Sequence, residues 1–127
     1  MIEKILIVDD SRVARRMLKH CIPRERGYEI HEAEDGREAV EKYQRVNPDL
    51  TFMDLTMPVM NGFEATEEIM EYDGGAMIVV TTADVQPRSI RRVLSLGAFD
   101  VIRKPPRPNS IQEAMAKVEN KLQDALE

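Results

Sequence analysis

The stretch Ile5-Leu6-Ile7-Val8-Asp9-Asp10 decides the fold, because it joins a short continuous apolar run to a pair of carboxylates. Four consecutive apolar residues are typical of a strand that is covered on both faces. Ser11 then stands where the N-cap of a helix is expected. Apolar residues recur at helical spacing after it, and the stripe predicted to face the core is Val13, Met17, Leu18, Cys21 and Ile22.

The same alternation of strand and helix continues along the chain. Further strands are predicted at residues 28–33, 50–53, 76–80 and 99–103. The first of these alternates with period two, which suits a strand near a sheet edge. Helices are predicted near Asp35, Gly62 and Ile90 and at Ser110, which opens a capping box. Short connections between such units imply an α/β fold: a (βα)5 doubly wound, five-stranded parallel sheet in a three-layer α/β/α arrangement.

Size and charge narrow the possible functions. The 127 residues suit one domain, residues 1–127, and are too few for two independent cores. The 23 acidic residues exceed the 18 basic ones, and a net charge of −5 argues against direct nucleic-acid binding. No apolar run approaches the roughly 20 residues that span a bilayer, and a signal-peptide pattern is lacking. We therefore expect a cytoplasmic protein without membrane insertion.

Side chains that can bind an ion or take part in a reaction directly follow the predicted strands. Doubly wound sheets bind ligands at the carboxyl ends of their strands. These residues are Asp9, Asp10, Asp54, Thr81, Thr82 and Lys104. Two carboxylates about 5 Å apart repel each other by roughly 3 kcal/mol at an effective dielectric constant of about 20. The cluster therefore predicts a bound cation. Mg²⁺ suits it, because Mg²⁺ needs only one or two carboxylates and keeps several waters, whereas Ca²⁺ takes more oxygens.

Once a metal and Lys104 offset its charge, Asp54 can act as a nucleophile toward a phosphoryl group. Phosphoryl transfer needs mainly positioning and neutralisation of the equatorial oxygens. Mg²⁺, Lys104 and the Thr82 hydroxyl can each hold one of those oxygens. The sequence therefore predicts a Mg²⁺-dependent phosphoryl-accepting site.

Four segments in register with the five predicted strands carry a resemblance to a known family. They are Val8-Asp9-Asp10-Ser11, the run from Met53 to Gly62, Thr81-Thr82-Ala83, and Lys104-Pro105. The chain resembles the receiver domains of response regulators in two-component systems over essentially its whole length. The resemblance implies the flavodoxin-like (CheY-like) form of the fold, in a single receiver domain.

The resemblance implies a metal set and a phosphoacceptor. Asp54 is the phosphoacceptor and also a metal ligand. Asp10 is implied to bind Mg²⁺ directly, and Asp9 through a water. The backbone carbonyl of Thr56 is implied as the third protein ligand.

The resemblance also implies a switch, and here the chain departs from the family. Thr82 corresponds to the switch hydroxyl and Lys104 to the cation that binds the phosphoryl group, with a cis peptide bond between Lys104 and Pro105. Receivers commonly carry Tyr or Phe three residues before the lysine, where this chain has Val101. Phe99 is expected one step away on the same strand face. Movement of the loop and the fourth helix is therefore the expected route for the signal.

The partners implied by the resemblance are a kinase and a target. The phosphoryl donor is a phosphohistidine on a sensor histidine kinase. The receiver catalyses only its own phosphorylation and its slow autodephosphorylation, so it is not expected to be an enzyme otherwise. Thr56 and Asp84 flank the path of the hydrolytic water, and whether Asp84 hinders or orients that water stays open.

The implied output surface consists of the fourth helix, the fifth strand and the fifth helix. Basic side chains gather on it: Arg88, Arg91, Arg92, Arg103 and Arg107. They predict a downstream protein target with acidic groups, and the alternative is a solvated basic face. The oligomeric state is expected to be a monomer or a phosphorylation-linked dimer. Action on its own and action within a larger regulator both stay open.

Three other functions compete with this interpretation. A haloacid-dehalogenase-type phosphatase would need a second Asp two residues after its nucleophile, but Arg12 follows Asp10 at that distance. A flavodoxin-like flavin carrier would need a first loop rich in Ser, Thr or Gly, and an acidic loop would repel its phosphate. An interaction domain that no longer uses phosphorylation would not need the set Asp10, Asp54, Thr82 and Lys104.

Overall fold

The computed structural model describes residues 1–126, and Glu127, the last residue of the predicted domain, lies outside the described residues. Strands and helices alternate along the chain. The elements are β1 (Lys4–Val8), α1 (Arg12–Cys21), a short 3-10 helix η1 (Arg24–Arg26), β2 (Glu29–Ala33), α2 (Gly36–Val46), β3 (Leu50–Met53), α3 (Gly62–Tyr72), β4 (Ile78–Thr82), α4 (Pro87–Ser95), β5 (Asp100–Arg103) and α5 (Pro108–Leu126).

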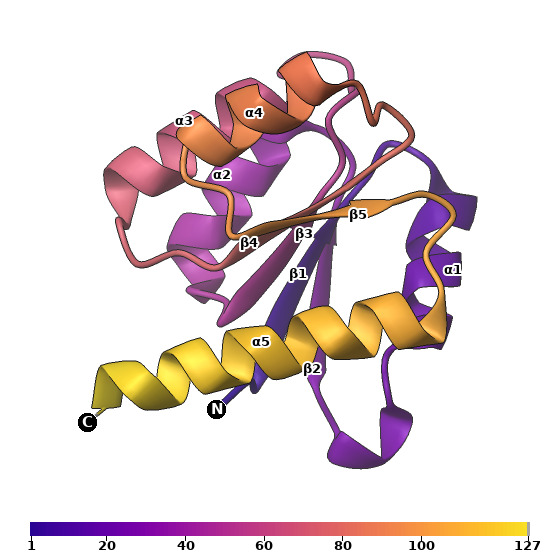
Figure 1. The fold of residues 1–127 in the computed structure, drawn as a ribbon, viewed down its shortest axis with the longest axis vertical. Coiled ribbons are helices and arrows are strands. Elements are labelled where there is room, and N and C mark those ends of the chain that lie inside the picture. Colours follow the sequence, from indigo (N-terminus) through magenta and orange to yellow (C-terminus); the bar gives the residue numbers. More distant parts are fainter. Residues whose placement is uncertain (127) are drawn as a thin grey trace.

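The strands form one parallel sheet with the order β2-β1-β3-β4-β5, which confirms the predicted (βα)5 fold. Helices α1 and α5 cover one face, and α2, α3 and α4 cover the other (Figure 1). The period-two strand β2 lies at an edge, as predicted. Because the order reverses at β1, the ends of β1 and β3 lie side by side at the edge of the sheet where ligands bind in this class of fold.

The apolar run of β1 supplies both layers of the core. Ile5 and Ile7 join the cluster under α1 and α5, while Leu6 and Val8 join the cluster under α2, α3 and α4. Burying such a side chain contributes about 1.5–3 kcal/mol. A strand that is apolar on both faces can therefore only sit between two helical layers. Within residues 1–126, no helix is both long enough and apolar enough to cross a bilayer.

Polar side chains cap the helices that begin beside the strand ends. The Ser11 hydroxyl accepts a hydrogen bond from the Ala14 amide, and the Asp35 carboxylate accepts one from the Glu38 amide. Such a cap stabilises a helix by about 1 kcal/mol. Each cap fixes the residue at which the chain turns from loop to helix.

The capping box predicted at Ser110 is wrong. Helix α5 begins at Pro108, where a fixed φ and a missing N–H fit the first turn. Ser110 lies inside the helix, and its hydroxyl accepts a hydrogen bond from the Arg107 amide and donates one to the Arg107 carbonyl.

The predicted inner stripe of α1 is wrong at two positions. Leu18, Cys21 and Ile22 are buried, but Val13 is 67% exposed and Met17 is 44% exposed. Val13 and Met17 are four residues apart and share one side of the helix, whereas Leu18 and Cys21 define the buried side. An apolar strip of α1 therefore faces solvent.

Candidate functional site

Three carboxylates converge where β1 and β3 end. Val8 pairs with Met53 across the two strands, so the residues that follow them emerge side by side. Asp9, Asp10 and Asp54 each have a carboxylate oxygen within 4.8 Å of the others. Asp9 and Asp54 are buried, with 4% and 5% of their surface exposed, and Asp10 is exposed. The Asp54 amide donates to the Val8 carbonyl at 2.9 Å, which ties the two strand ends together.

Lys104 brings an ammonium group to these carboxylates from β5. Its Nζ lies 2.6 Å from Asp9 Oδ2 and 3.3 Å from Asp54 Oδ1. Because β4 separates β5 from β3, the lysine side chain passes over the end of β4 to reach them. The peptide bond between Lys104 and Pro105 is cis, as expected.

The charges at this site are only partly compensated. Burial raises the pKa of Asp54, and the charge of Asp9 raises it further, while Lys104 lowers it without cancelling the rise. Burial alone would lower the pKa of Lys104, but Asp9 and Asp54 outweigh burial and raise it. Three carboxylates and one ammonium leave two negative charges. A hard divalent cation fits this set of oxygen donors, as Mg²⁺ sites in proteins do.

Thr82 stands at the end of β4, beside this charge cluster. Its side chain is buried, and its Oγ1 accepts a hydrogen bond from the Asp84 amide at 2.9 Å. That bond uses an oxygen lone pair and leaves the hydroxyl hydrogen able to donate to a ligand. The site opens into a hollow of about 760 Å³, whose lining includes Asp10, Asp54, Thr56, Thr82, Asp84 and Lys104.

The loop from β4 to α4 connects Thr82 to a helix. Asp84 accepts a hydrogen bond from the Ser89 hydroxyl of α4 at 2.6 Å and another from the Gln86 amide at 3.1 Å. The Ser89 and Gln86 bonds lower the pKa of Asp84. Sequence reasoning placed Asp84 beside the water path but missed this link, because it depends on where α4 begins.

Phe99 does not lie on the same face of the sheet as Val101, contrary to the prediction from the sequence. Val101 is half-buried and packs against the cluster under α2, α3 and α4, whereas Phe99 packs against the cluster under α1 and α5. The expectation that the two side chains share a face is wrong, because β5 begins at Asp100 and the period of two does not extend to Phe99.

Two further features of the loop after Asp54 were missed from the sequence. A Cβ atom on Gly62 would collide with the Asp54 carbonyl oxygen and would lie 2.8 Å from Leu55 Cα. Gly62 therefore lets α3 begin against the loop that carries Asp54. Val59 has φ of 68°, a left-handed conformation that a β-branched residue rarely adopts.

The predicted basic residues do not behave as one group. Arg88, Arg91, Arg92, Arg103 and Arg107 are all exposed. The Arg92 guanidinium, however, lies 4.2 Å from the centre of the Phe63 ring on α3, and this cation–π contact stabilises the packing of α3 and α4. Among the described residues, a cation–π contact is found for Arg92 and not for the other four arginines.

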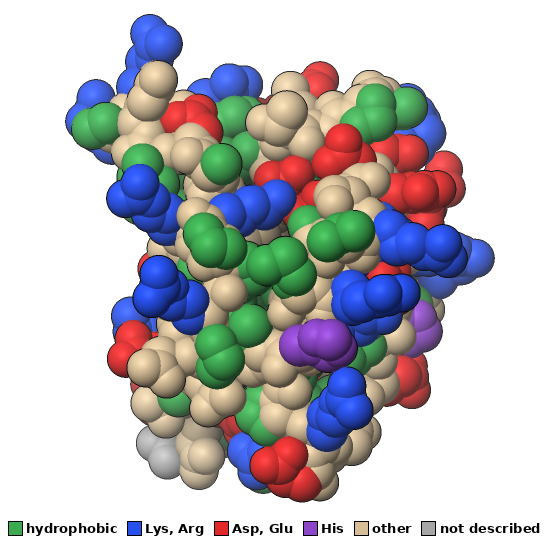
Figure 2. Space-filling view, turned by 90° about the vertical axis from the view of Figure 1, so that its right-hand side faces the viewer, with side chains coloured by type: hydrophobic (Ala, Val, Ile, Leu, Met, Phe, Trp, Pro, Cys, Tyr) green, Lys and Arg blue, Asp and Glu red, His purple; other side chains and the backbone are tan. Residues whose placement is uncertain are grey.

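The α1 side of the molecule carries acidic, hydrophobic and basic side chains. Figure 2 shows acidic side chains near the top of the α1 side, where the strands end, above hydrophobic and basic side chains. Val13 and Met17 of α1 are exposed apolar side chains.

The amino-acid sequence of this chain is similar to those of known proteins. The family model of the response regulator receiver domain matches residues 5–116. The chemotaxis protein CheY of Thermotoga maritima is 46% identical over 117 residues, covering 91% of this chain and 97% of that protein. CheY of Halobacterium salinarum is 40% identical over 119 residues, covering 93% of this chain and 98% of that protein.

Solved structures agree with the sequence matches. The receiver domain of AraT, a response regulator from Geobacillus stearothermophilus, superposes with a TM-score of 0.89 at 32% identity and covers all of both chains. The CheX-CheY-BeF3-Mg²⁺ complex from Borrelia burgdorferi contains a chain with a TM-score of 0.85 at 32% identity, covering 91% of this chain and 88% of that one. Receiver domains act in phosphorylation-dependent signalling with histidine kinases and downstream targets. The chain belongs to the response regulator receiver domain family.

Proposed function

We propose that Asp54 accepts a phosphoryl group from the phosphohistidine of a sensor histidine kinase, in a reaction that requires Mg²⁺. One observation carries this proposal: three carboxylates and a single ammonium meet at the end of the sheet, with two negative charges left uncompensated. If the cluster served only to stabilise the fold, its negative and positive charges would be expected to balance. The Borrelia relative, which was solved with beryllofluoride and Mg²⁺, supports the same chemistry.

The metal would be held by the carboxylates of Asp9, Asp10 and Asp54 and by the backbone carbonyl of Thr56. Asp10, the exposed member, would bind the ion directly, and Asp9 would act through a water. When bound, Mg²⁺ neutralises the charge on the phosphoryl oxygens and so lowers the cost of bringing a phosphate to an acidic site.

The side chains of this chain carry out the transfer. A carboxylate oxygen of Asp54 forms a bond to phosphorus, the phosphorus–nitrogen bond of phosphohistidine breaks, and the imidazole leaves with the electron pair. Lys104, which lies 3.3 Å from Asp54, binds a phosphoryl oxygen. The Thr82 hydroxyl donates to another, since its oxygen already accepts from Asp84. Slow hydrolysis of the acyl phosphate, with Thr56 and Asp84 beside the water path, resets the protein.

The signal reaches the surface through α4. When Thr82 moves toward the phosphoryl group, it pulls on the Asp84 amide, and Asp84 is hydrogen-bonded to Ser89 of α4. This route does not need an aromatic residue at position 101. The conformational change then alters the face formed by α4, β5 and α5, where Arg88, Arg91, Arg103 and Arg107 bind acidic groups of a downstream protein.

The remaining features of the proposal follow the family. Residues 1–127 act as one receiver domain in the cytoplasm, as a monomer or a phosphorylation-linked dimer. The domain binds no nucleic acid directly and does not insert into a membrane. It catalyses only its own phosphorylation and dephosphorylation.

Phosphorylation is tested by incubating the protein with acetyl phosphate and Mg²⁺ and measuring the intact mass. We expect a gain of one phosphoryl group that disappears with EDTA and in Asp54→Asn. Asp100→Asn is the matched control, because Asp100 lies at the opposite end of β5 from Lys104. An Asp54→Asn protein that still gains phosphate, or an unmodified wild type, contradicts the proposal.

A further inference from the structure

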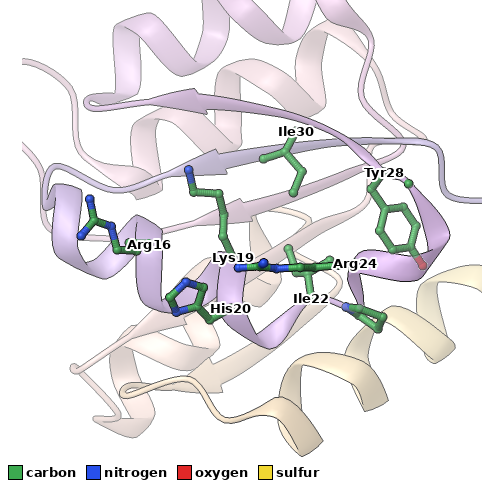
Figure 3. A pocket seen from close by; sticks show the side chains of 9 residues that line it. Arg16, Lys19, His20, Ile22, Arg24, Tyr28 and Ile30 are labelled. Atoms are coloured by element: carbon green, nitrogen blue, oxygen red, sulfur yellow. The ribbon is translucent and has the colours of Figure 1, made fainter.

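A second hollow lies between α1, η1 and β2 and has a volume of about 380 Å³. It shares no lining residue with the hollow at the carboxylates. Its volume is within the range of roughly 300–1,000 Å³ that is common for small-molecule sites. Figure 3 shows its residues coming from three separate segments, with Arg16 and His20 on α1, Arg24 on η1 and Tyr28 near the start of β2.

The turn that forms this hollow is held in place. Gly27 adopts φ of 66°, which a residue without a Cβ tolerates, and its amide donates to the Arg24 carbonyl. Arg26 forms an ion pair with Glu119 of α5 at 3.2 Å, so η1 is fixed to the body of the domain. Arg24 is thereby directed across the hollow, and Figure 3 shows its guanidinium extending toward Lys19 and His20.

The charge of this hollow is opposite to that of the chain. No aspartate or glutamate lines it among the described residues, although the net charge of the protein is −5. Lys19 is neutralised by Glu32 at 2.8 Å, but Arg16 and Arg24 form no ion pair within residues 1–126. Arg24, which has no acidic partner among the described residues, therefore extends over the hollow toward Lys19 and His20, while Arg16 lies at its far end (Figure 3). An arginine guanidinium can bind two phosphate oxygens at once, so an unpaired arginine beside a lysine and a histidine suits a phosphate.

The rest of the wall is apolar. Tyr28 and Ile30 are half-buried and pack at the edge of the cluster under α1 and α5, and Ile22 forms the floor. An inorganic anion would leave this apolar surface unused. A flat apolar group beside the phosphate would cover it, and a tyrosine ring favours stacking with a planar partner.

We infer that this hollow binds a small phosphorylated molecule with a planar ring, of which a nucleotide is the simplest example. Arg24 binds the phosphate with Lys19 and His20 beside it, and the ring lies against Tyr28 and Ile30. The site is separate from the proposed phosphoryl-accepting site and does not depend on Asp54.

The test titrates the full chain with GTP, ATP and AMP by calorimetry and by amide chemical shifts, with pyrophosphate as the ring-free probe. EDTA is present throughout, so that phosphate does not bind at the acidic site through a metal. We expect at least one nucleotide to bind more tightly than pyrophosphate and to shift amides at residues 16–30. Arg24→Ala should weaken binding by roughly tenfold or more, since a charge-assisted hydrogen bond is lost.

Two variants serve as controls. Arg37→Ala removes an exposed arginine on α2 that does not line the hollow, and it should bind nucleotide as the wild type does. Asp54→Asn should also bind unchanged, which separates this inference from the proposed function. The inference is overturned if no nucleotide binds, if pyrophosphate binds as tightly as every nucleotide, or if Arg24→Ala has no more effect than Arg37→Ala. It is equally overturned if an acidic peptide shifts the same amides and nucleotides do not.

Discussion

Replacing Gly62 by alanine should destabilise the domain and slow its phosphorylation together. A Cβ atom at this position meets only backbone: the Asp54 carbonyl oxygen, Leu55 Cα at 2.8 Å and the Asp54 carbonyl carbon at 2.9 Å. Ordinary contact begins near 3.4 Å, so the backbone must separate by at least the difference, 3.4 − 2.8, or about 0.6 Å. Backbone cannot rotate away as a side chain can. Overpacking of this kind costs about 1–3 kcal/mol, a large share of the roughly 5–15 kcal/mol that stabilises a domain.

The same movement displaces Asp54, because the colliding atom is its own carbonyl oxygen. A misplacement of about 1 Å can slow a reaction by on the order of 100-fold, so we expect phosphorylation by acetyl phosphate to slow by roughly 10- to 100-fold. Urea denaturation measures the first effect and intact mass against time the second. Gly74→Ala is the matched control, since nothing lies within 4 Å of a Cβ there. If Gly62→Ala unfolds at the same urea concentration as Gly74→Ala, the reasoning is refuted.

Three further predictions concern the switch loop, a strained residue and an ion-pair network. Ser89→Ala should change the lifetime of the acyl phosphate and reduce the change in α4 amide exchange on phosphorylation. Ser95→Ala is the control, because the Ser95 hydroxyl donates to the Arg92 carbonyl within α4, and it should have neither effect. Equal behaviour of the two variants would contradict the proposed route from Thr82 to α4. Val59→Gly should stabilise the domain by about 1 kcal/mol in urea denaturation, because φ of 68° strains a β-branched residue and 76% of its surface is exposed; a lower midpoint would contradict this. Hydrogen bonds from Lys19 and, to a lesser extent, from Arg15 lower the pKa of Glu32 in the folded protein. Ionised Glu32 therefore contributes to the free energy of unfolding above its ordinary pKa of 4.5, and this contribution is lost as the pH falls through the lowered pKa of the folded state. The stability difference between wild type and Glu32→Gln should therefore shrink at acidic pH, and a constant difference in thermal melts would count against the network.

Local pattern was sufficient to predict the elements of this fold. The apolar run at Ile5–Val8 and the caps at Ser11 and Asp35 lie within a few residues of the features they control, so they can be identified from the sequence. Position after a strand was also sufficient to predict the acids and the lysine of the site, which lie at the carboxyl end of the sheet. Thr82 lies at the same end, but it is the last residue of β4 rather than a residue that follows the strand, because β4 runs two residues beyond its predicted end at residue 80.

Helix α1 and helix α5 show where local pattern fails. Val13 and Met17 satisfy helical spacing as well as Leu18 does, but burial depends on which side of the helix meets the sheet and α5. Ser110 satisfies the capping pattern, yet Pro108 begins the helix earlier. The choice between equivalent local patterns is made by the surfaces that pack against them.

The amino-acid sequence by itself determined the order of strands and helices, the identity of the family and the residues available at the strand ends, because each depends on neighbours along the chain. Only the tertiary structure decided that Lys104 pairs with Asp9 more closely than with Asp54, that Asp84 links Thr82 to α4, and that Arg24 extends over a hollow toward Lys19 and His20. These contacts join residues that are brought together by sheet order and helix packing. Their distances and charges follow from where whole elements come to rest, which no short stretch of sequence specifies.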